Sequence, residues 1–182
     1  MRKGRQSKGK EIRPTFFVFC EGETEETYVK FLRSQYRVPV EIDAKIAGNR
    51  ITAKYISNYK QQKITHPKDT TFLIYDCDVQ VIVDKLQKIN KVNLLLSNPC
   101  FELWYLLHFQ EQKAELTTDE CVKKLSTHIP NYVKGSFDKI LETKIIKNKE
   151  TAIVRARKIV ELKNPSTNVY VFVEELDKIK EK

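Results

Sequence analysis

Two kinds of apolar pattern alternate along the first part of the chain. Short runs of aromatic and β-branched residues without polar interruption predict strands that are covered on both faces. Between these runs, apolar residues recur at the three- and four-residue spacing of an amphipathic helix. The expected strands are residues 15–20, 38–46, 71–75 and 92–96. Residues 38–46 alternate and contain Pro39, so this strand is expected at an edge of the sheet.

The helices expected from this spacing separate the strands and continue after the last of them. They span residues 24–36 (with Thr24 as the cap), 52–63, 79–90, 101–109, 116–128, 137–146, 149–162 and 169–179. Alternating strands and helices favour a parallel sheet with right-handed crossovers. We therefore expect an α/β fold with a four-stranded, mostly parallel sheet flanked by helices, followed by a helical C-terminal half.

A single domain accounts for almost the whole chain of 182 residues. We place it at residues 14–182, with an α/β core at 14–110 and a helical part at 111–182. Residues 1–13 are rich in Lys and Arg, so they are expected to form a flexible basic arm. Such an arm is either a nucleic-acid-binding tail or a solubilising end.

Acidic residues directly follow two of the expected strands. Glu21 comes after strand 15–20, and Asp76 and Asp78 come after strand 71–75. Ligands of open α/β sheets bind at the carboxyl ends of the strands, and residues two apart in an extended chain point to the same side. If the two strands are neighbours, the three carboxylates converge and repel one another unless a cation lies between them. Oxygen ligands of this kind suit Mg²⁺ or Mn²⁺.

Further polar residues are expected near the same edge of the sheet. Asn98 and Glu102 follow strand 92–96. Asn98 is a candidate for binding substrate, and Glu102 lies in an apolar segment where a carboxylate needs a partner. The alternative for Glu102 is a surface acid at a helix N-terminus. His108, on the same helix, is either a hydrogen-bonded structural histidine or a contact to substrate.

Three residues of the second half of the chain are candidates for binding substrate. Lys134 could contact a phosphate, and the alternative is a solvated lysine. Arg155 could also contact a phosphate, or it could lie partly buried and paired. Thr167 either lines the site or caps the final helix.

Charge and composition narrow the class of protein. The net charge of +9 favours the binding of polyanions, nucleic acid above all. The alternative is that the charge only keeps the protein soluble. No apolar run reaches the roughly 20 residues of a membrane span, and the N-terminal residues lack the apolar core of a secretory signal. The four cysteines have no zinc-type spacing, so we expect buried, reduced thiols in a cytoplasmic protein. A Gly-rich phosphate loop is also missing, so an NTPase is not expected.

Four segments of the chain, in order, resemble the RloB family. They are FVFCEGETEETYVKFL, IYDCD, LLLSNPCFELWYLLHF and NPSTNVYVFVEEL, and the resemblance extends over residues 15 to 177. RloB-like proteins resemble TOPRIM domains, which bind magnesium and act on phosphodiesters in topoisomerases, primases and nucleases. The resemblance implies that Glu21 is the TOPRIM glutamate and that Asp76 and Asp78 are the Asp-x-Asp pair. It also implies a role in bacterial abortive infection beside an ATPase-type partner protein.

These observations leave three functions open. In the first, Glu21, Asp76 and Asp78 hold Mg²⁺ or Mn²⁺ in a nuclease that cleaves DNA or RNA. A neighbouring carboxylate, Glu23, Glu25 or Glu102, would act as its general base or as a second set of metal ligands. The second function is a non-catalytic subunit of a defence complex that binds metal together with nucleic acid or a nucleotide. In the third, the acids are structural and bind no metal.

Overall fold

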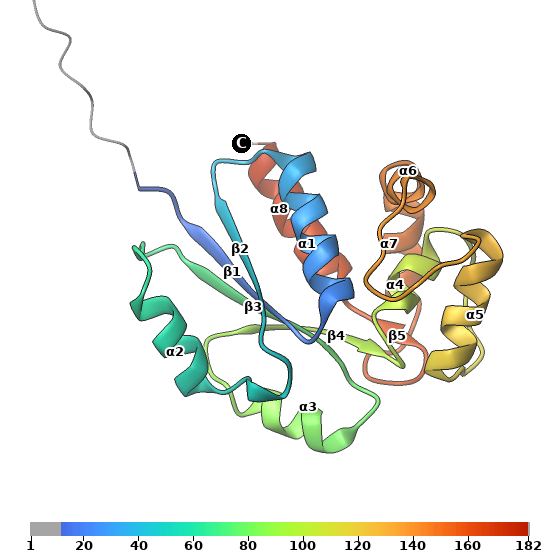
Figure 1. The fold of residues 1–182 in the computed structure, drawn as a ribbon, viewed down its shortest axis with the longest axis horizontal. Helices are drawn as coiled ribbons and strands as arrows, with labels where there is room; N and C mark the ends of the chain where they lie inside the picture. Colours follow the sequence, from blue (N-terminus) through green and yellow to red (C-terminus); the bar gives the residue numbers. More distant parts are fainter. Residues whose placement is uncertain (1–11, 182) are drawn as a thin grey trace, which may run out of the picture.

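A five-stranded sheet forms the centre of the structure (Figure 1). The computed structural model describes residues 12–181, so the arm expected at residues 1–13 lies almost wholly outside the described residues. The strands are β1 (Thr15–Cys20), β2 (Glu41–Ile46), β3 (Thr70–Asp76), β4 (Asn93–Asn98) and β5 (Ser166–Thr167). They run in the order β2-β1-β3-β4-β5, with β1 to β4 parallel and β5 antiparallel to β4.

The fifth strand corrects the sequence prediction of four strands. Ser166 and Thr167 pair with the last two residues of β4, so the second half of the chain returns to the sheet. Asn168 continues this edge with its side chain, whose oxygen accepts a hydrogen bond from the Leu96 N–H at 2.6 Å. A two-residue strand has no periodicity to detect, and Ser, Thr and Asn are typical of turns and caps. The sequence therefore predicted a cap where the structure has a strand.

Helices cover both faces of the sheet, as predicted (Figure 1). One face carries α1 (Glu23–Tyr36) and α8 (Tyr170–Lys180), and the other carries α2 (Ala53–Gln61) and α3 (Gln80–Gln87). In β1, Phe16, Val18 and Cys20 are buried on the face that α1 and α8 cover. Phe17 and Phe19 are buried on the face that α2 and α3 cover. Because alternate side chains enter two separate cores, the strand is apolar at every position from Phe16 to Cys20.

Four more helices gather beside β4 and β5, on the right of Figure 1. They are α4 (Glu102–Leu107), α5 (Thr118–His128), α6 (Lys139–Lys147) and α7 (Lys149–Arg157). All residues of α4 are buried, and the helix packs against α5 and α7, so Trp104 belongs to the core. The four cysteines are buried and unbonded, as expected. Within the described residues, no helix combines the length and the apolar character that a membrane crossing needs.

The start of α1 differs from the prediction that Thr24 caps the helix. The N-cap is Gly22 in an extended conformation, and the Glu25 carboxylate accepts a hydrogen bond from the Gly22 N–H at 3.0 Å. Because Glu25 satisfies the end of the helix, the Thr24 hydroxyl is available for contacts elsewhere. Because α1 begins directly after β1, Thr24 and Glu25 both lie at the carboxyl edge of the sheet.

Candidate functional site

Glu21 and Asp76 meet at the carboxyl edge of the sheet. Glu21 follows β1 and Asp76 ends β3, and these strands are parallel neighbours. The Asp76 N–H donates to Glu21 Oε2 at 2.8 Å, and the Glu21 N–H donates to the Ile74 carbonyl at 3.0 Å. The backbone therefore holds the two carboxylates at one point, where open α/β sheets bind their ligands.

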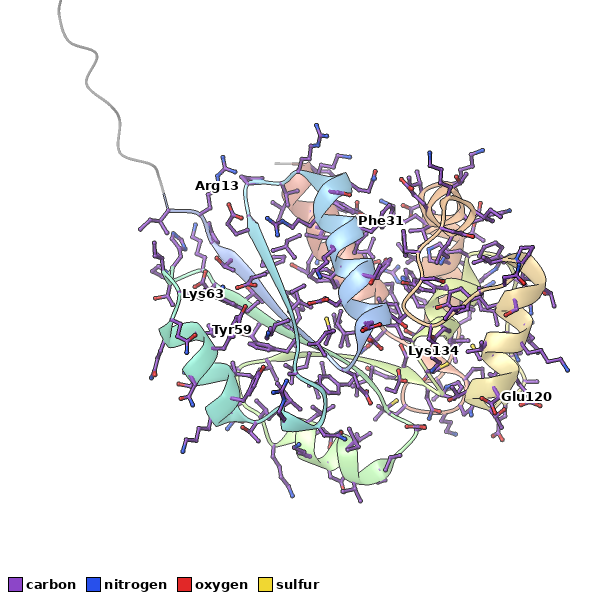
Figure 2. The ribbon with its side chains drawn as sticks, viewed as in Figure 1. Arg13, Phe31, Tyr59, Lys63, Glu120 and Lys134 are labelled. Carbon is purple, nitrogen blue, oxygen red and sulfur yellow. The ribbon has the colours of Figure 1, made fainter. Side chains whose placement is uncertain are left out.

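A pocket of about 300 Å³, which we call the acid pocket, lies beside these two residues. It is bounded by the ends of β1 and β3, the first turns of α1 and α4, and the segment between α5 and α6. Its lining residues are Glu21, Gly22, Glu23, Thr24, Glu25, Asp76, Glu102, Lys134 and Gly135. Lys134 is the basic member of this set, and Figure 2 shows it between α1 and α5. Five carboxylates therefore share the pocket with one ammonium group.

Burial and the charges of neighbouring carboxylates raise the pKa values of three acids in the acid pocket, Asp76, Glu25 and Glu21. Burial, with the charges of Glu25 and Glu21, raises the pKa of Asp76 to about 9. Burial likewise raises the pKa of Glu25 to about 7, and the charge of Glu102 adds to the effect. The pKa of Glu21 is raised by burial and, in part, by Asp78. The raised pKa values show that this pocket disfavours several negative charges unless a positive charge compensates them.

One carboxylate oxygen of Asp76 has no partner. Asp76 Oδ1 is buried and makes no hydrogen bond with any group of residues 12–181. A buried acceptor left without a donor costs about 1–3 kcal/mol. Since Asp76 lines the acid pocket, a cation or a proton donor bound there would satisfy this oxygen.

Glu102 is buried, with 1% exposure, and has three partners. Its Oε1 atom accepts from the hydroxyls of Thr24 at 3.3 Å and Tyr132 at 3.4 Å, and Oε2 lies 3.7 Å from Lys134 Nζ. These contacts explain how an apolar segment carries a carboxylate, and they exclude the alternative of a surface acid. Sequence patterns do not mark Thr24 or Tyr132 as partners of Glu102, because Thr24 has the pattern of a cap and Tyr132 lies in a distant loop.

The loop between α5 and α6 is fastened over the acid pocket. The Gly135 N–H donates to Thr24 Oγ1 at 3.0 Å. The Tyr132 hydroxyl, from the same loop, donates to Glu102 Oε1. Gly135 has a φ of +82°, and a Cβ atom at this position would lie 3.2 Å from the Glu23 side chain. Only glycine fits this close approach without strain, and the loop places Lys134 at the pocket.

Asp78 lies outside the acid pocket. β3 ends at Asp76, a bend follows at Asp78, and the exposed Asp78 side chain lines a neighbouring hollow of about 520 Å³. The expectation that both aspartates face one point depends on a chain that stays extended, and this chain does not. In residues 12–181, no three His, Cys, Asp or Glu side chains form a group arranged to hold a metal ion.

Three of the four residues predicted to bind substrate lie away from the acid pocket. Asn98 donates to a backbone carbonyl in the segment after α7 at 3.2 Å. The Thr167 hydroxyl, in β5, pairs with a serine hydroxyl of β4 at 2.9 Å. Arg155 donates to the last carbonyl of α4 at 2.6 Å and lines a separate hollow. Of these four residues, the structure brings only Lys134 to the acidic residues.

His108 is enclosed in the core. Its Nδ1 atom donates to the Trp104 carbonyl at 2.8 Å, and burial lowers the pKa of its imidazole to about 4. The side chain is therefore neutral at physiological pH. This is the structural alternative that the sequence left open.

A comparison with protein families gives one match. The family model of RloB-like proteins matches residues 16–176, which is most of the chain. The chain belongs to the RloB-like protein family. All residues that line the acid pocket of this RloB-like protein fall inside the matched range. Comparisons with curated proteins and with solved structures found no significant match.

Proposed function

We propose that this RloB-like protein cleaves phosphodiester bonds of nucleic acid with the help of a divalent cation, Mg²⁺ or Mn²⁺, bound in the acid pocket. The observation that carries the proposal is Asp76 Oδ1, which is buried among carboxylates and has no partner in residues 12–181. Removing charged oxygens from water is costly unless an opposite charge compensates them. A divalent cation supplies more compensation than the single ammonium of Lys134.

The donor atoms fit such an ion. Hard divalent cations prefer carboxylate oxygens, and Asp76 and Glu21 offer them at the ends of two rigid strands. Glu25 borders the same point, since its charge contributes to the raised pKa of Asp76. Asp78 would join only if the bend after β3 turned toward the pocket. The TOPRIM-like pairing of Asp76 with Asp78 would therefore require a change in that bend.

The pocket residues would divide the chemistry among them. The bound ion would polarise the phosphodiester and make a water molecule more acidic. Glu25, with a pKa of about 7, suits the removal of a proton from that water at neutral pH. Lys134 would bind a phosphate oxygen, and Glu102 would position Lys134 through their contact at 3.7 Å.

Membership of the RloB-like family is consistent with a defence-related role. We extend this to abortive infection, with an ATPase-type partner as the expected regulator. A non-catalytic binding subunit is the second candidate, and one observation favours it. Oxygens of both Glu21 and Glu25 already accept backbone N–H groups, so part of the acid cluster serves the fold.

A cleavage assay separates the two candidates. Labelled DNA and RNA are incubated with Mg²⁺ or Mn²⁺ and with wild type, Asp76→Asn or Glu41→Gln. Glu41 is exposed at the opposite, amino edge of the sheet, so Glu41→Gln makes the same chemical change away from the pocket. The nuclease proposal expects metal-dependent cutting by wild type and Glu41→Gln and none by Asp76→Asn. Equal cutting by all three proteins would rule out the acid pocket as the active site.

A further inference from the structure

A three-residue turn reaches the carboxyl edge of the sheet from the side of β2. The 3₁₀ turn η1 (Gly48–Arg50) follows β2 directly, and the Ala47 N–H donates to the Cys20 carbonyl at 2.9 Å. A Cβ atom on Gly48 would lie 3.4 Å from the Glu21 carbonyl oxygen. The turn is therefore in contact with the backbone of a residue that lines the acid pocket.

Side chains from two other elements fix this turn. The Tyr75 hydroxyl, from β3, donates to the Gly48 carbonyl at 3.0 Å. Lys85 Nζ, from α3, donates to the Asn49 carbonyl at 2.7 Å. With both carbonyls held, the backbone that carries Arg50 has a defined place beside the pocket.

Arg50 itself is exposed and lacks an acidic partner. Its guanidinium carbon lies 5.9 Å from the centre of the Tyr55 ring, and no carboxylate of residues 12–181 forms an ion pair with it. Lys85 also lacks such a partner in the described part of the chain, and its one hydrogen bond is to a carbonyl. An ammonium has three donors, so Lys85 keeps capacity for an anion. We call Arg50 and Lys85 the basic pair.

The opposite side of the acid pocket has the opposite charge. Beyond β4, the hollow that contains Asp78 is also lined by Glu115 and Glu120, and Figure 2 labels Glu120 at the start of α5. These carboxylates would repel a phosphate backbone. Charge thus changes sign along the edge of the sheet, from the basic pair beside β2 to the acidic hollow beside β4.

We propose that a nucleic-acid strand enters the acid pocket from the β2 side, with its phosphates bound by Arg50 and Lys85. This inference rests on the proposed function, because it takes the substrate to be nucleic acid. Arg50 can bind two oxygens of one phosphate, and Lys85, which donates to the carbonyl of the residue before Arg50, adds a point charge. Lys134 lies at the pocket itself, so the strand would pass from the basic pair to Lys134 across the carboxylates.

The test is binding of labelled single-stranded DNA and RNA, measured over a range of salt concentrations. All proteins carry Asp76→Asn, so that binding is read without cleavage. Arg50→Ala should weaken binding about tenfold and lower the slope of log affinity against log salt by about 0.7 for a single strand. Lys85→Gln, which keeps a donor for the Asn49 carbonyl, should lower the slope similarly.

Lys68→Ala is the matched control. Lys68 is exposed in the loop before β3, at the amino edge of the sheet, so its loss should leave the slope unchanged. If Arg50→Ala and Lys85→Gln bind like the Lys68→Ala protein, the inference is wrong while the proposed substrate stands. If the protein with Asp76→Asn alone binds neither DNA nor RNA at low salt, the proposed substrate is wrong, and the inference is then wrong as well. Melting curves of each variant confirm that the fold is retained.

Discussion

The fold opposes a negative charge on Asp76. Its carboxyl group is surrounded by Glu21, Glu25 and Glu102, and its Oδ1 atom has no partner among the described residues. Asparagine has nearly the same shape and no charge, so Asp76→Asn removes the repulsion without opening a cavity. In metal-free buffer we expect the unfolding free energy of the variant to exceed that of wild type by about 1–3 kcal/mol. The variant should therefore melt at a higher temperature than wild type.

Added Mn²⁺ should reverse that order, because an ion that binds only the folded wild type raises its melting temperature. Thermal unfolding of both proteins with a chelator and with Mn²⁺ provides the comparison. A loss of stability for Asp76→Asn in the chelator would instead mean that the ionised carboxylate supports the fold.

His108 gives the molecule a defined loss of stability in acid. Burial holds its folded-state pKa near 4, below the ordinary value of 6.5. Between these values the unfolded chain binds a proton that the folded chain does not, so stability falls as pH drops through this range. At about pH 5 the loss is about 2 kcal/mol.

The variant His108→Asn keeps a donor near the position of Nδ1 and removes the titration. Urea unfolding of both proteins at neutral pH and at about pH 5 should show a smaller acid loss in the variant. The raised pKa values of the pocket carboxylates act in the opposite direction, because they add stability as the pH falls. Both proteins have these carboxylates, so the difference between the two proteins reports His108 alone. An identical acid loss in both proteins would show that His108 is not the source.

At the scale of elements, Glu102 joins α4, α1 and the α5–α6 loop. Glu102→Gln keeps an acceptor for Thr24 and Tyr132 but loses the charge that attracts Lys134. We expect this variant to keep its stability and to lose about tenfold or more in cleavage rate. Glu102→Leu leaves two hydroxyls without an acceptor and should cost about 2–4 kcal/mol of stability.

Melting temperature and single-turnover cleavage, measured on both variants, separate these effects. If Glu102→Gln is as destabilising as Glu102→Leu, the residue acts only on the fold. If Glu102→Gln cleaves at the wild-type rate, Lys134 does not depend on Glu102 for its position.

The same elements show how far the sequence could predict the structure. β1 and β3 were predicted within one residue of their observed bounds, because an apolar run covered on both faces is distinctive. Strand β5 could not be found, since two residues have no period and the pairing depends on a partner some 70 positions away. The cap of α1 was assigned to Thr24 because glycine carries no capping side chain to recognise.

The site was predicted only as far as strand ends determine it. Glu21 and Asp76 follow from two parallel neighbours, whereas Asp78 depends on a bend that spacing does not reveal. Tyr132 and Gly135 reach the acid pocket through the tertiary fold of the second half of the chain. No local pattern marks a loop residue that is brought to a site by long-range contacts.

At the scale of the whole molecule, two charge distributions act over different ranges. The net charge of +9 draws polyanions from a distance of about a Debye length, roughly 8 Å at physiological salt. The acid pocket acts at contact distance and would repel the same phosphates without a cation. Metal binding is therefore the step on which cleavage depends, whereas the basic pair can bind a nucleic-acid strand without the metal.

The most direct measurement is a calorimetric titration of Mn²⁺ into metal-free wild type, Asp76→Asn and Glu41→Gln. The account predicts binding to wild type and Glu41→Gln and loss of binding in Asp76→Asn. Binding of equal strength to all three proteins, or to none of them, would contradict a metal site in the acid pocket.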